Sequence, residues 1–355
     1  MQLEHEWIKN ELAGTHIVVV VPAYQVARQI GRVVNNIPDY VREIIIVDDC
    51  SSDDTITEVQ RVGSSRVRLI RHQTNQGVGG AMLSGYAMAL QLGAEIVVKM
   101  DGDDQMDPHY LPSLIFPIIK GEADYTKGNR FIHTYELVQM PLARRVGNFG
   151  LTFLTKLATG YWHIFDPNNG YTAIHSKVLE IINIEKIHRR YFFETSMLAE
   201  LRHTQGVVLD VSIPARYGDE VSSLSLPRAL IAFPFNLMKA LLYRIGWQYF
   251  RYDFNAVSVF LIFSLPLLTF GLAWGGLQWY ISVRHGIIAT TGTVLLSVLP
   301  IILGVQFLIQ AVAADILSVP TKVLHRRFER WNVIPAHQSS WATYFDNEEY
   351  VKTNP

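Results

Sequence analysis

Two long stretches of the chain contain no charged side chain. No Asp, Glu, Lys or Arg occurs in residues 254–283 or 286–314, and Leu, Ile, Val and Phe dominate both. Each stretch exceeds the roughly 20 apolar residues that a helix needs to cross a bilayer. Charged residues make up 18% of the whole chain, below the about 25% of average soluble domains, and the deficit lies in these stretches. The sequence therefore predicts a soluble domain with a short membrane module. It excludes a wholly soluble protein and a polytopic membrane protein.

The apolar stretches are separated by little more than Arg284 and His285, which predicts a helical hairpin. Two buried helices of a soluble domain are the alternative. The flanks are basic: Arg244 and Arg251 precede the hairpin, and Lys322, Arg326, Arg327 and Arg330 follow it. The positive-inside rule then places both flanks in the cytoplasm, with two spans in the inner or plasma membrane. The first 15 residues are charged and lack an apolar core, so we expect no signal peptide there.

The segment before the hairpin is amphipathic in composition. Residues 227–253 mix Leu, Phe, Trp and Tyr with Arg and Lys, which is typical of helices lying in the lipid headgroup region. A linker helix packed on the soluble domain is the alternative. We expect a lead-in at 1–15, an α/β domain at 16–226, interfacial helices at 227–253, membrane helices at 254–283 and 286–314, and a cytoplasmic tail at 315–355.

The soluble part alternates between strand and helix patterns. Residues 17–21 are an unbroken apolar run, and residues 43–49 (EIIIVDD) are an apolar run that ends in two carboxylates; both are typical of buried strands. Ile30, Val33, Val34 and Ile37 follow helical spacing between them. Further strands are predicted near 66–72, 95–100, 125–131 and 207–217, and further helices near 56–62, 81–93, 142–159, 173–182 and 192–206. This order predicts a mostly parallel sheet with helices on both faces, which binds ligands beyond the carboxyl ends of its strands.

Carboxylates gather at those strand ends. Residues 101–107 hold four carboxylates directly after a buried strand, and Asp48 and Asp49 end a neighbouring strand. Mg²⁺ and Mn²⁺ prefer such oxygen ligands and usually keep waters or phosphate oxygens in their shell. A solvated acidic turn is the alternative. Because crowded carboxylates repel one another, the pattern favours a site for a cation or a donor-rich ligand.

Other features narrow the function. The Gly-rich turn Asn75–Gly80 lacks a dinucleotide fingerprint, because Met82 occupies the last glycine position and the turn follows the third strand. We interpret it as a tight turn near a donor site. A net charge of −1 gives no support for nucleic-acid binding. Cys50 is the only cysteine, which excludes internal disulfides and a cysteine-based zinc site.

Six short motifs follow one another in a familiar order. They are VPAY, VDDCSSDDT, NQGVGGA, DGDDQMDP, GNR and DPNNGY. Together they resemble the family-2 glycosyltransferases of GT-A (Rossmann-like) fold, and among them the enzymes that glycosylate dolichol phosphate or undecaprenyl phosphate. The resemblance spans about residues 16–215. It implies a metal-dependent, inverting transfer of a hexose from a UDP- or GDP-sugar to a polyprenyl phosphate, with Mg²⁺ or Mn²⁺.

The resemblance also assigns the donor site. It implies that Pro22, Ala23, Tyr24 and Asp49 line the nucleoside pocket, with Asp49 accepting a hydrogen bond from the base. Asp48 would assist, or serve only as a structural carboxylate at the strand end. The remaining donor-site residues are Asn75, Gly77, Asp101 and Gly102.

Asp101 and Asp103 match the family's DxD motif, and Asp103 with Gln105 would hold the metal on the diphosphate. Asp104 stands where the family has Leu. Whether Asp101 or Asp104 joins the metal shell is therefore left open.

The acceptor side rests on basic residues. Arg130 and Arg145 resemble the two arginines that bind the acceptor phosphate in the family, and Arg144 is equally suited to the role given to Arg145. The alternative is that each arginine forms only a surface salt bridge, which contributes little to stability. Asp166 and Asn168–Gly170 match a loop near the acceptor. Glu194 matches an acidic residue near the sugar, or is a helix-start carboxylate. The implied catalytic set is Asp103, Arg130, Arg145, Asp166 and Glu194.

Two other functions are weighed. A processive polysaccharide synthase would carry QxxRW and more membrane helices, whereas Arg330–Trp331 is preceded by Arg327 instead of Gln. A non-catalytic membrane scaffold is disfavoured by the retained carboxylates. The sugar, the nucleotide, the exact lipid, the pathway and the oligomeric state, a homo-oligomer included, are left open.

Overall fold

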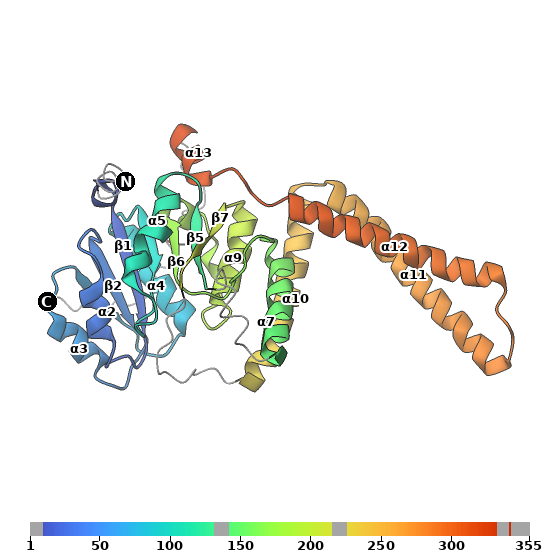
Figure 1. The fold of residues 1–355 in the computed structure, drawn as a ribbon, viewed down its shortest axis with the longest axis horizontal. Helices are drawn as coiled ribbons and strands as arrows, with labels where there is room; N and C mark the ends of the chain where they lie inside the picture. The colour runs from blue at the N-terminus through green and yellow to red at the C-terminus, as the bar shows by residue number, and fades with distance from the viewer. Residues whose placement is uncertain (1–9, 131–141, 215–225, 332–340, 342–355) are drawn as a thin grey trace. The chain divides into compact units, whose positions relative to one another are not determined.

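The computed structural model describes residues 10–130, 142–214, 226–331 and 341 (Figure 1). The chain divides into two compact units. The first comprises residues 1–240 together with 320–355, and the second comprises residues 241–319. The segment that follows the two apolar helices therefore rejoins the α/β unit.

A seven-stranded sheet forms the centre of the first unit, in the order β3-β2-β1-β4-β6-β5-β7. Strands β1 to β4 are parallel, β6 is antiparallel to both of its neighbours, and β5 and β7 are parallel. The predicted mostly parallel sheet is confirmed. The strands are β1 Ile17–Ala23, β2 Glu43–Asp48, β3 Val67–Arg71, β4 Ile96–Lys99, β5 Tyr125–Asn129, β6 Thr172–His175 and β7 Val208–Ser212.

One predicted element is wrong. The expected helix over 173–182 begins instead with the antiparallel strand β6, and only the short helix α8 Ser176–Leu179 follows it. All four residues of β6 are buried between β4 and β5. So short an apolar run has no readable periodicity, and only its neighbours in the sheet define it as a strand.

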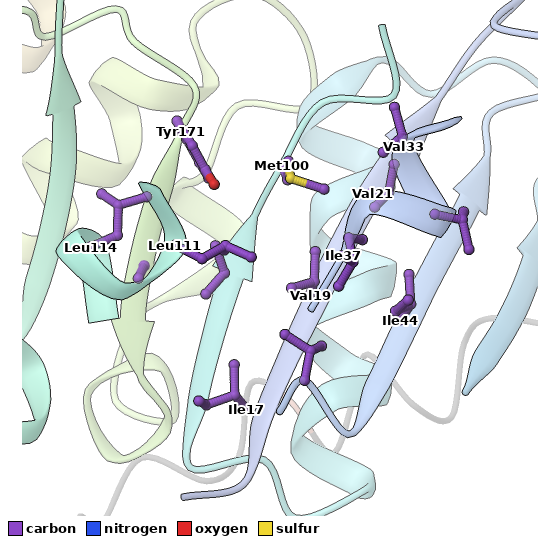
Figure 2. Close-up of a cluster of buried hydrophobic side chains, with 14 of the residues drawn as sticks. Ile17, Val19, Val21, Val33, Ile37, Ile44, Met100, Leu111, Leu114 and Tyr171 are labelled. Atoms are coloured by element: carbon purple, nitrogen blue, oxygen red, sulfur yellow. The ribbon is translucent and has the colours of Figure 1, made fainter. Parts of the chain in front are cut away.

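Helices cover both faces of the sheet. Ile17, Val19 and Val21 of β1 belong to a buried cluster with side chains of α2 and α5 (Figure 2). Helix α4 packs on the opposite face of the sheet, where Gly85 lies against Val20 of β1. The helices of this unit are α2 Ile30–Asn36, α3 Thr55–Val62, α4 Val78–Gln91, α5 Leu111–Ile119, α7 Leu142–Thr159, α8, α9 Phe193–Thr204, α10 Leu226–Gly246, which continues into the second unit, and α13 Leu324–Trp331.

Helix α13 is fixed to the α/β unit by one buried carboxylate. Asp124, fully buried at the start of β5, accepts hydrogen bonds from the backbone of Leu324 and His325 at 2.9–3.0 Å and from the His325 ring at 2.9 Å. The His325 ring stacks on His175, with 4.3 Å between ring centroids. Trp341 is also buried and donates to the carbonyl of Leu179. Residues after the apolar helices are thus part of the α/β unit.

The second unit contains an antiparallel pair of helices, α11 Ala256–His285 and α12 Thr291–Leu317 (Figure 1). Both are long and apolar enough to cross a membrane. Ser264 donates to the carbonyl of Gly304 at 2.9 Å, a contact of small residues that allows close helix packing in membranes.

A π-helical segment, Trp247–Tyr252, leads into α11. Beside it Arg244 is buried and binds the Asp315 carboxylate through both terminal nitrogens, at 2.7 and 3.1 Å. Arg244 is therefore not a free surface charge.

Candidate active site

The predicted site residues lie at one edge of the sheet. The register pairs Ala23 with Asp48 and Asp48 with Arg71, so the carboxyl ends of β1, β2 and β3 are level. Lys99, the last residue of β4, pairs with Thr172, the first residue of β6. The loops that follow β1, β2, β4 and β5 and the loop that precedes β6 consequently meet at this edge.

Backbone strain marks the same edge. Among the described non-glycine residues with positive φ, Gln25 follows β1, Cys50 follows β2 and Asp104 follows β4, with φ of 56°, 63° and 63°. Left-handed backbone of this kind is costly for residues with a Cβ and concentrates at binding and catalytic sites. The strain therefore agrees with the position predicted from the acidic motifs.

Asp49 organises the turn between β3 and α4. It is 3% exposed, and its two carboxylate oxygens accept from the backbone N–H of Gln76 at 2.8 Å and of Gly77 at 2.7 Å. The His72 ring lies 2.8 Å from the same carboxylate and also contacts Ser84 at 2.9 Å. These contacts assign Asp49 to holding the Gly-rich turn. Acceptance of a hydrogen bond from a base stays a prediction.

The glycines of this turn permit a close backbone contact. A Cβ on Gly79 would lie 2.1 Å from the carbonyl oxygen of His188, and the Gly80 N–H donates to the carbonyl of Arg189 at 3.0 Å. Arg189 in turn donates to the Gln76 side chain at 2.6 Å. The turn is thus packed on the segment that leads into α9. Predicted donor residue Asn75 lies here and donates to the Asp49 carbonyl at 3.3 Å.

The ends of β1 and β2 hold the other residues that the sequence assigns to the nucleoside pocket. Tyr24 is 49% exposed, whereas Ala23 and Asp48 are buried. Asp48 accepts from the Ser51 N–H at 3.3 Å, and its other oxygen is buried without a hydrogen-bond partner among the described residues. Gly102 lies against the carbonyl of Pro22. The predicted residues Pro22, Ala23, Tyr24, Asp48 and Gly102 are therefore neighbours.

The carboxylates of the acidic loop have different partners. Asp101 contacts the ammonium of Lys99 at 2.6 Å. Asp103 accepts from the Gln105 backbone at 3.1 Å. Asp104 lies 3.3 Å from Arg32. Each carboxylate thus occupies its own electrostatic environment.

The donor chemistry of this loop fits a divalent metal. Asp103 is half-buried and Gln105 is exposed, so a carboxylate and an amide oxygen border solvent beside the strand ends. Within the part of the chain that the structure describes, no group of three or more His, Cys, Asp or Glu side chains is arranged to hold a metal. A site of few protein ligands is the kind in which Mg²⁺ retains waters and substrate phosphate oxygens.

Two of the residues that the sequence assigns to the acceptor side form an ion pair. Arg130, next after β5, places Nε 2.8 Å and Nη2 3.2 Å from the two oxygens of the buried Asp166 carboxylate. Asn129 donates to Asp210 at 2.9 Å, and burial raises the pKa of Asp210 to about 6. Arg144 and Arg145 fall in α7, but their side chains lie outside the described residues.

Two buried lysines were not predicted from the sequence. Lys99 is the last residue of β4, and Lys127 lies in the middle of β5. Each is at most 1% exposed. Lys127 donates to the carbonyl of Asn169, and burial lowers its pKa to about 8. Burial disfavours the charged form of Lys99, but the carboxylates of Asp101 and Glu194 outweigh it and raise the pKa. The sequence feature that could have indicated these buried lysines is a lysine inside an otherwise uncharged strand.

Glu194 lies on the first turn of α9, and its side chain lies beside Lys99. Its carboxylate is 3.5 Å from the Lys99 ammonium. The structure therefore gathers Asp101, Glu194, Arg130 and Asp166 from four separate segments around the loop that precedes β6.

A mostly parallel sheet covered by helices on both faces defines an α/β protein of GT-A fold, and solved structures share that fold. Glucosyl-3-phosphoglycerate synthase from Mycobacterium tuberculosis, in complex with Mn²⁺, uridine diphosphate and phosphoglyceric acid, matches with a TM-score of 0.51 and 21% identity over 67% of this chain and 81% of that one.

Sequence comparison gives the family. The glycosyl transferase family 2 model matches residues 18–182. A UDP-N-acetylglucosamine–dolichyl-phosphate N-acetylglucosaminyltransferase of Methanococcus voltae is 34% identical over 51% of this chain and 77% of its own length. An undecaprenyl-phosphate mannosyltransferase of Micrococcus luteus is 25% identical over 51% of this chain and 75% of its own. The chain belongs to glycosyl transferase family 2, which confirms the resemblance seen in the motifs.

Proposed function

We propose that the protein transfers a hexose from a nucleotide-diphosphate sugar to a membrane polyprenyl phosphate, with inversion at C1. The observation that carries the proposal is the pairing, at one sheet edge, of an acidic donor side with the Arg130–Asp166 acceptor side. The same chain carries two helices apolar enough to span a membrane. The names of its relatives, which include dolichyl-phosphate and undecaprenyl-phosphate transferases, point to the same acceptor.

On the donor side, Asp103 and Gln105 would hold Mg²⁺ or Mn²⁺ on the diphosphate. The bound metal would supply neutralisation of the charge that develops on the leaving group. Tyr24 and Pro22 would border the base, and Asp49 fixes the turn beside it.

On the acceptor side, Arg130 orients the lipid phosphate. Asp166 fixes the plane of the guanidinium through two contacts, and guanidinium geometry suits recognition of phosphate. Arg145, or Arg144, is proposed as the second cation. Pairing with arginine lowers the nucleophilicity of the phosphate somewhat, but holds it in line with C1.

The transfer is a single displacement. An oxygen of the acceptor phosphate forms a bond to C1 of the hexose as the bond from C1 to the diphosphate oxygen breaks, and the nucleoside diphosphate leaves with the electron pair. Attack on the face opposite the leaving group inverts C1. The phosphate is already anionic at neutral pH, so the reaction needs no strong general base, unlike attack by a sugar hydroxyl.

For membrane placement, we propose that α11 and α12 span the bilayer and that α10 and the π-helical segment lie at its surface. Residues on both sides of the hairpin belong to the α/β unit, and α13 is anchored there by Asp124. An even number of spans returns the chain to the side it left. With the basic flanks, this supports a cytoplasmic catalytic domain.

The test is a panel of radiolabelled UDP- and GDP-sugars, incubated with membranes containing the full chain, Mg²⁺ and undecaprenyl phosphate. Label in the organic phase, released by mild acid as a monosaccharide, supports the proposal. Membranes with the Asp103→Asn variant are the control. Label in a polymer or in a water-soluble product contradicts a lipid-phosphate acceptor and favours a processive or hydroxyl-acceptor transferase. Absence of nucleotide-sugar binding in calorimetry favours a scaffold.

A further inference from the structure

Lys99 is a buried cation that contacts two carboxylates from distant segments. Its side chain is 1% exposed. The ammonium lies 2.6 Å from Asp101 of the acidic loop and 3.5 Å from Glu194 of α9. A buried ammonium is costly unless it is paired, and here both of its charge partners are residues of the predicted site.

The loop that precedes β6 lies against the same Lys99 ammonium. A Cβ at Gly170 would lie 2.4 Å from the Lys99 ammonium and 2.9 Å from the Asp101 carboxylate. A methyl group at this position would force the Lys99 ammonium or the Asp101 carboxylate to shift. The neighbouring Asn169 carbonyl is held by Lys127, and Asp166 is held by Arg130. The loop that precedes β6 therefore lies on three cations, and Lys99 among them also contacts Asp101 of the acidic loop.

We propose that Lys99 is a positioning residue of the glycosyl transfer, whose ammonium sets the acidic loop, Glu194 and Gly170 in one fixed arrangement. This inference rests on the proposed function, because it concerns the geometry of donor and acceptor during transfer. It adds a residue that does not touch either substrate, since its side chain is buried beneath the groups that would.

The physical reason is electrostatic. Without the Lys99 ammonium, the partly buried carboxylates of Asp101 and Glu194 would lose the cation that both contact, and like charges repel. The acidic loop and the start of α9 would separate, and Gly170 would lose the surface on which it rests. Displacement of reacting groups by about 1 Å can cost about 10²-fold in rate.

Two variants of the full-length protein test the proposal independently. Lys99→Met removes the charge and keeps a flexible apolar side chain of similar length. Gly170→Ala keeps Lys99 but forces a methyl group into the space between it and Asp101. The matched control is Gly14→Ala, where an added Cβ meets nothing within 4 Å. For each protein we would measure thermal unfolding, calorimetric affinity for the nucleotide sugar with Mg²⁺, and kcat and KM for lipid-product formation.

We expect both site variants to lose about 10²-fold in kcat at saturating nucleotide sugar and Mg²⁺, beyond any change in nucleotide-sugar affinity. Gly14→Ala should behave as wild type. Wild-type kcat in either site variant overturns the proposal. So does a loss explained wholly by weaker nucleotide binding. If Lys99→Met does not fold, Gly170→Ala decides alone. If the wild-type protein itself forms no lipid product, the proposed function fails instead, and the two failures are thereby distinguished.

Discussion

Arg130 and Asp166 form a two-point ion pair at the edge of the sheet. Nε and Nη2 of the guanidinium lie 2.8 and 3.2 Å from the two oxygens of one buried carboxylate. The arginine follows β5 and the aspartate lies in the loop before β6, so the pair ties together the segments that border the acceptor side. The arginine side chain is 43% exposed, so a phosphate can approach the guanidinium while Asp166 holds it.

Loss of the Arg130–Asp166 pair should raise the KM for the acceptor and lower kcat. Arg130→Lys keeps the charge but cannot make both contacts, because a lysine ammonium is a single point charge. We expect a higher KM for polyprenyl phosphate and a lower kcat, with nucleotide-sugar affinity unchanged. Steady-state kinetics with varied acceptor measure this. Arg61→Lys, in the exposed pair with Glu58, is the control and should change nothing. Unchanged acceptor kinetics in Arg130→Lys would remove this arginine from the acceptor site.

The acidic loop allows its adjacent carboxylates to be compared. Asp103→Asn should reduce turnover by about 10²-fold or more, because it removes charge from the proposed metal site. Asp104 pairs with Arg32, and Asn tolerates its left-handed backbone, so Asp104→Asn should retain most activity. Turnover at increasing Mg²⁺ or Mn²⁺ separates the two variants. The reverse ranking would move the metal site to Asp104.

Asp49 should matter for the shape of the donor site. In Asp49→Ala the backbone N–H groups of Gln76 and Gly77 lose their acceptor, and buried unsatisfied donors cost about 1–3 kcal/mol each. We expect a lower free energy of unfolding and weaker nucleotide-sugar binding, measured by denaturant titration and calorimetry. The exposed Asp39 gives the control Asp39→Ala. Wild-type affinity in Asp49→Ala would show that the turn does not shape the donor site.

Acid should weaken the docking of α13. Burial, with the neighbouring His325, lowers the pKa of His175 to about 3 from an ordinary value of 6.5. Between these values the unfolded state binds the additional proton, so stability falls as the pH drops below about 6.5, by up to about 1.4 kcal/mol per pH unit. The other charged groups near His175 are Asp124, Lys177 and Arg326.

Amide hydrogen exchange of residues 324–331, corrected for intrinsic rates, should show earlier opening at pH 5 than at pH 7. The variant His175→Gln should lack this dependence. Equal protection of α13 in the wild-type protein at both pH values would contradict the assignment.

Much of the donor side follows from local sequence. The apolar run Ile17–Val21 predicts a buried strand, and the carboxylates after β2 and β4 predict the ligand-binding edge of the sheet. Both predictions succeed because these patterns are formed by residues that are adjacent in the sequence. The strand β6 was missed because four buried residues owe their conformation to β4 and β5. Lys99 and Lys127 were missed because a charged residue in a strand normally indicates exposure.

The role of Asp124 depends on a partner 200 residues away. Arg244 is counted in the sequence only as one of the basic residues that precede the hairpin, whereas in the fold it is buried against Asp315. In both cases the pairing arises from tertiary contacts that no local pattern encodes.

In the proposed reaction a lipid-borne phosphate accepts the sugar. The most direct measurement compares purified full-length protein with undecaprenyl phosphate and with undecaprenol, each with the same labelled nucleotide sugar and Mg²⁺. We expect an acid-labile monosaccharide lipid with the phosphate and none with the alcohol, because only the phosphate is anionic and able to bind Arg130. Equal product from the alcohol, or product only from a soluble acceptor, would contradict it.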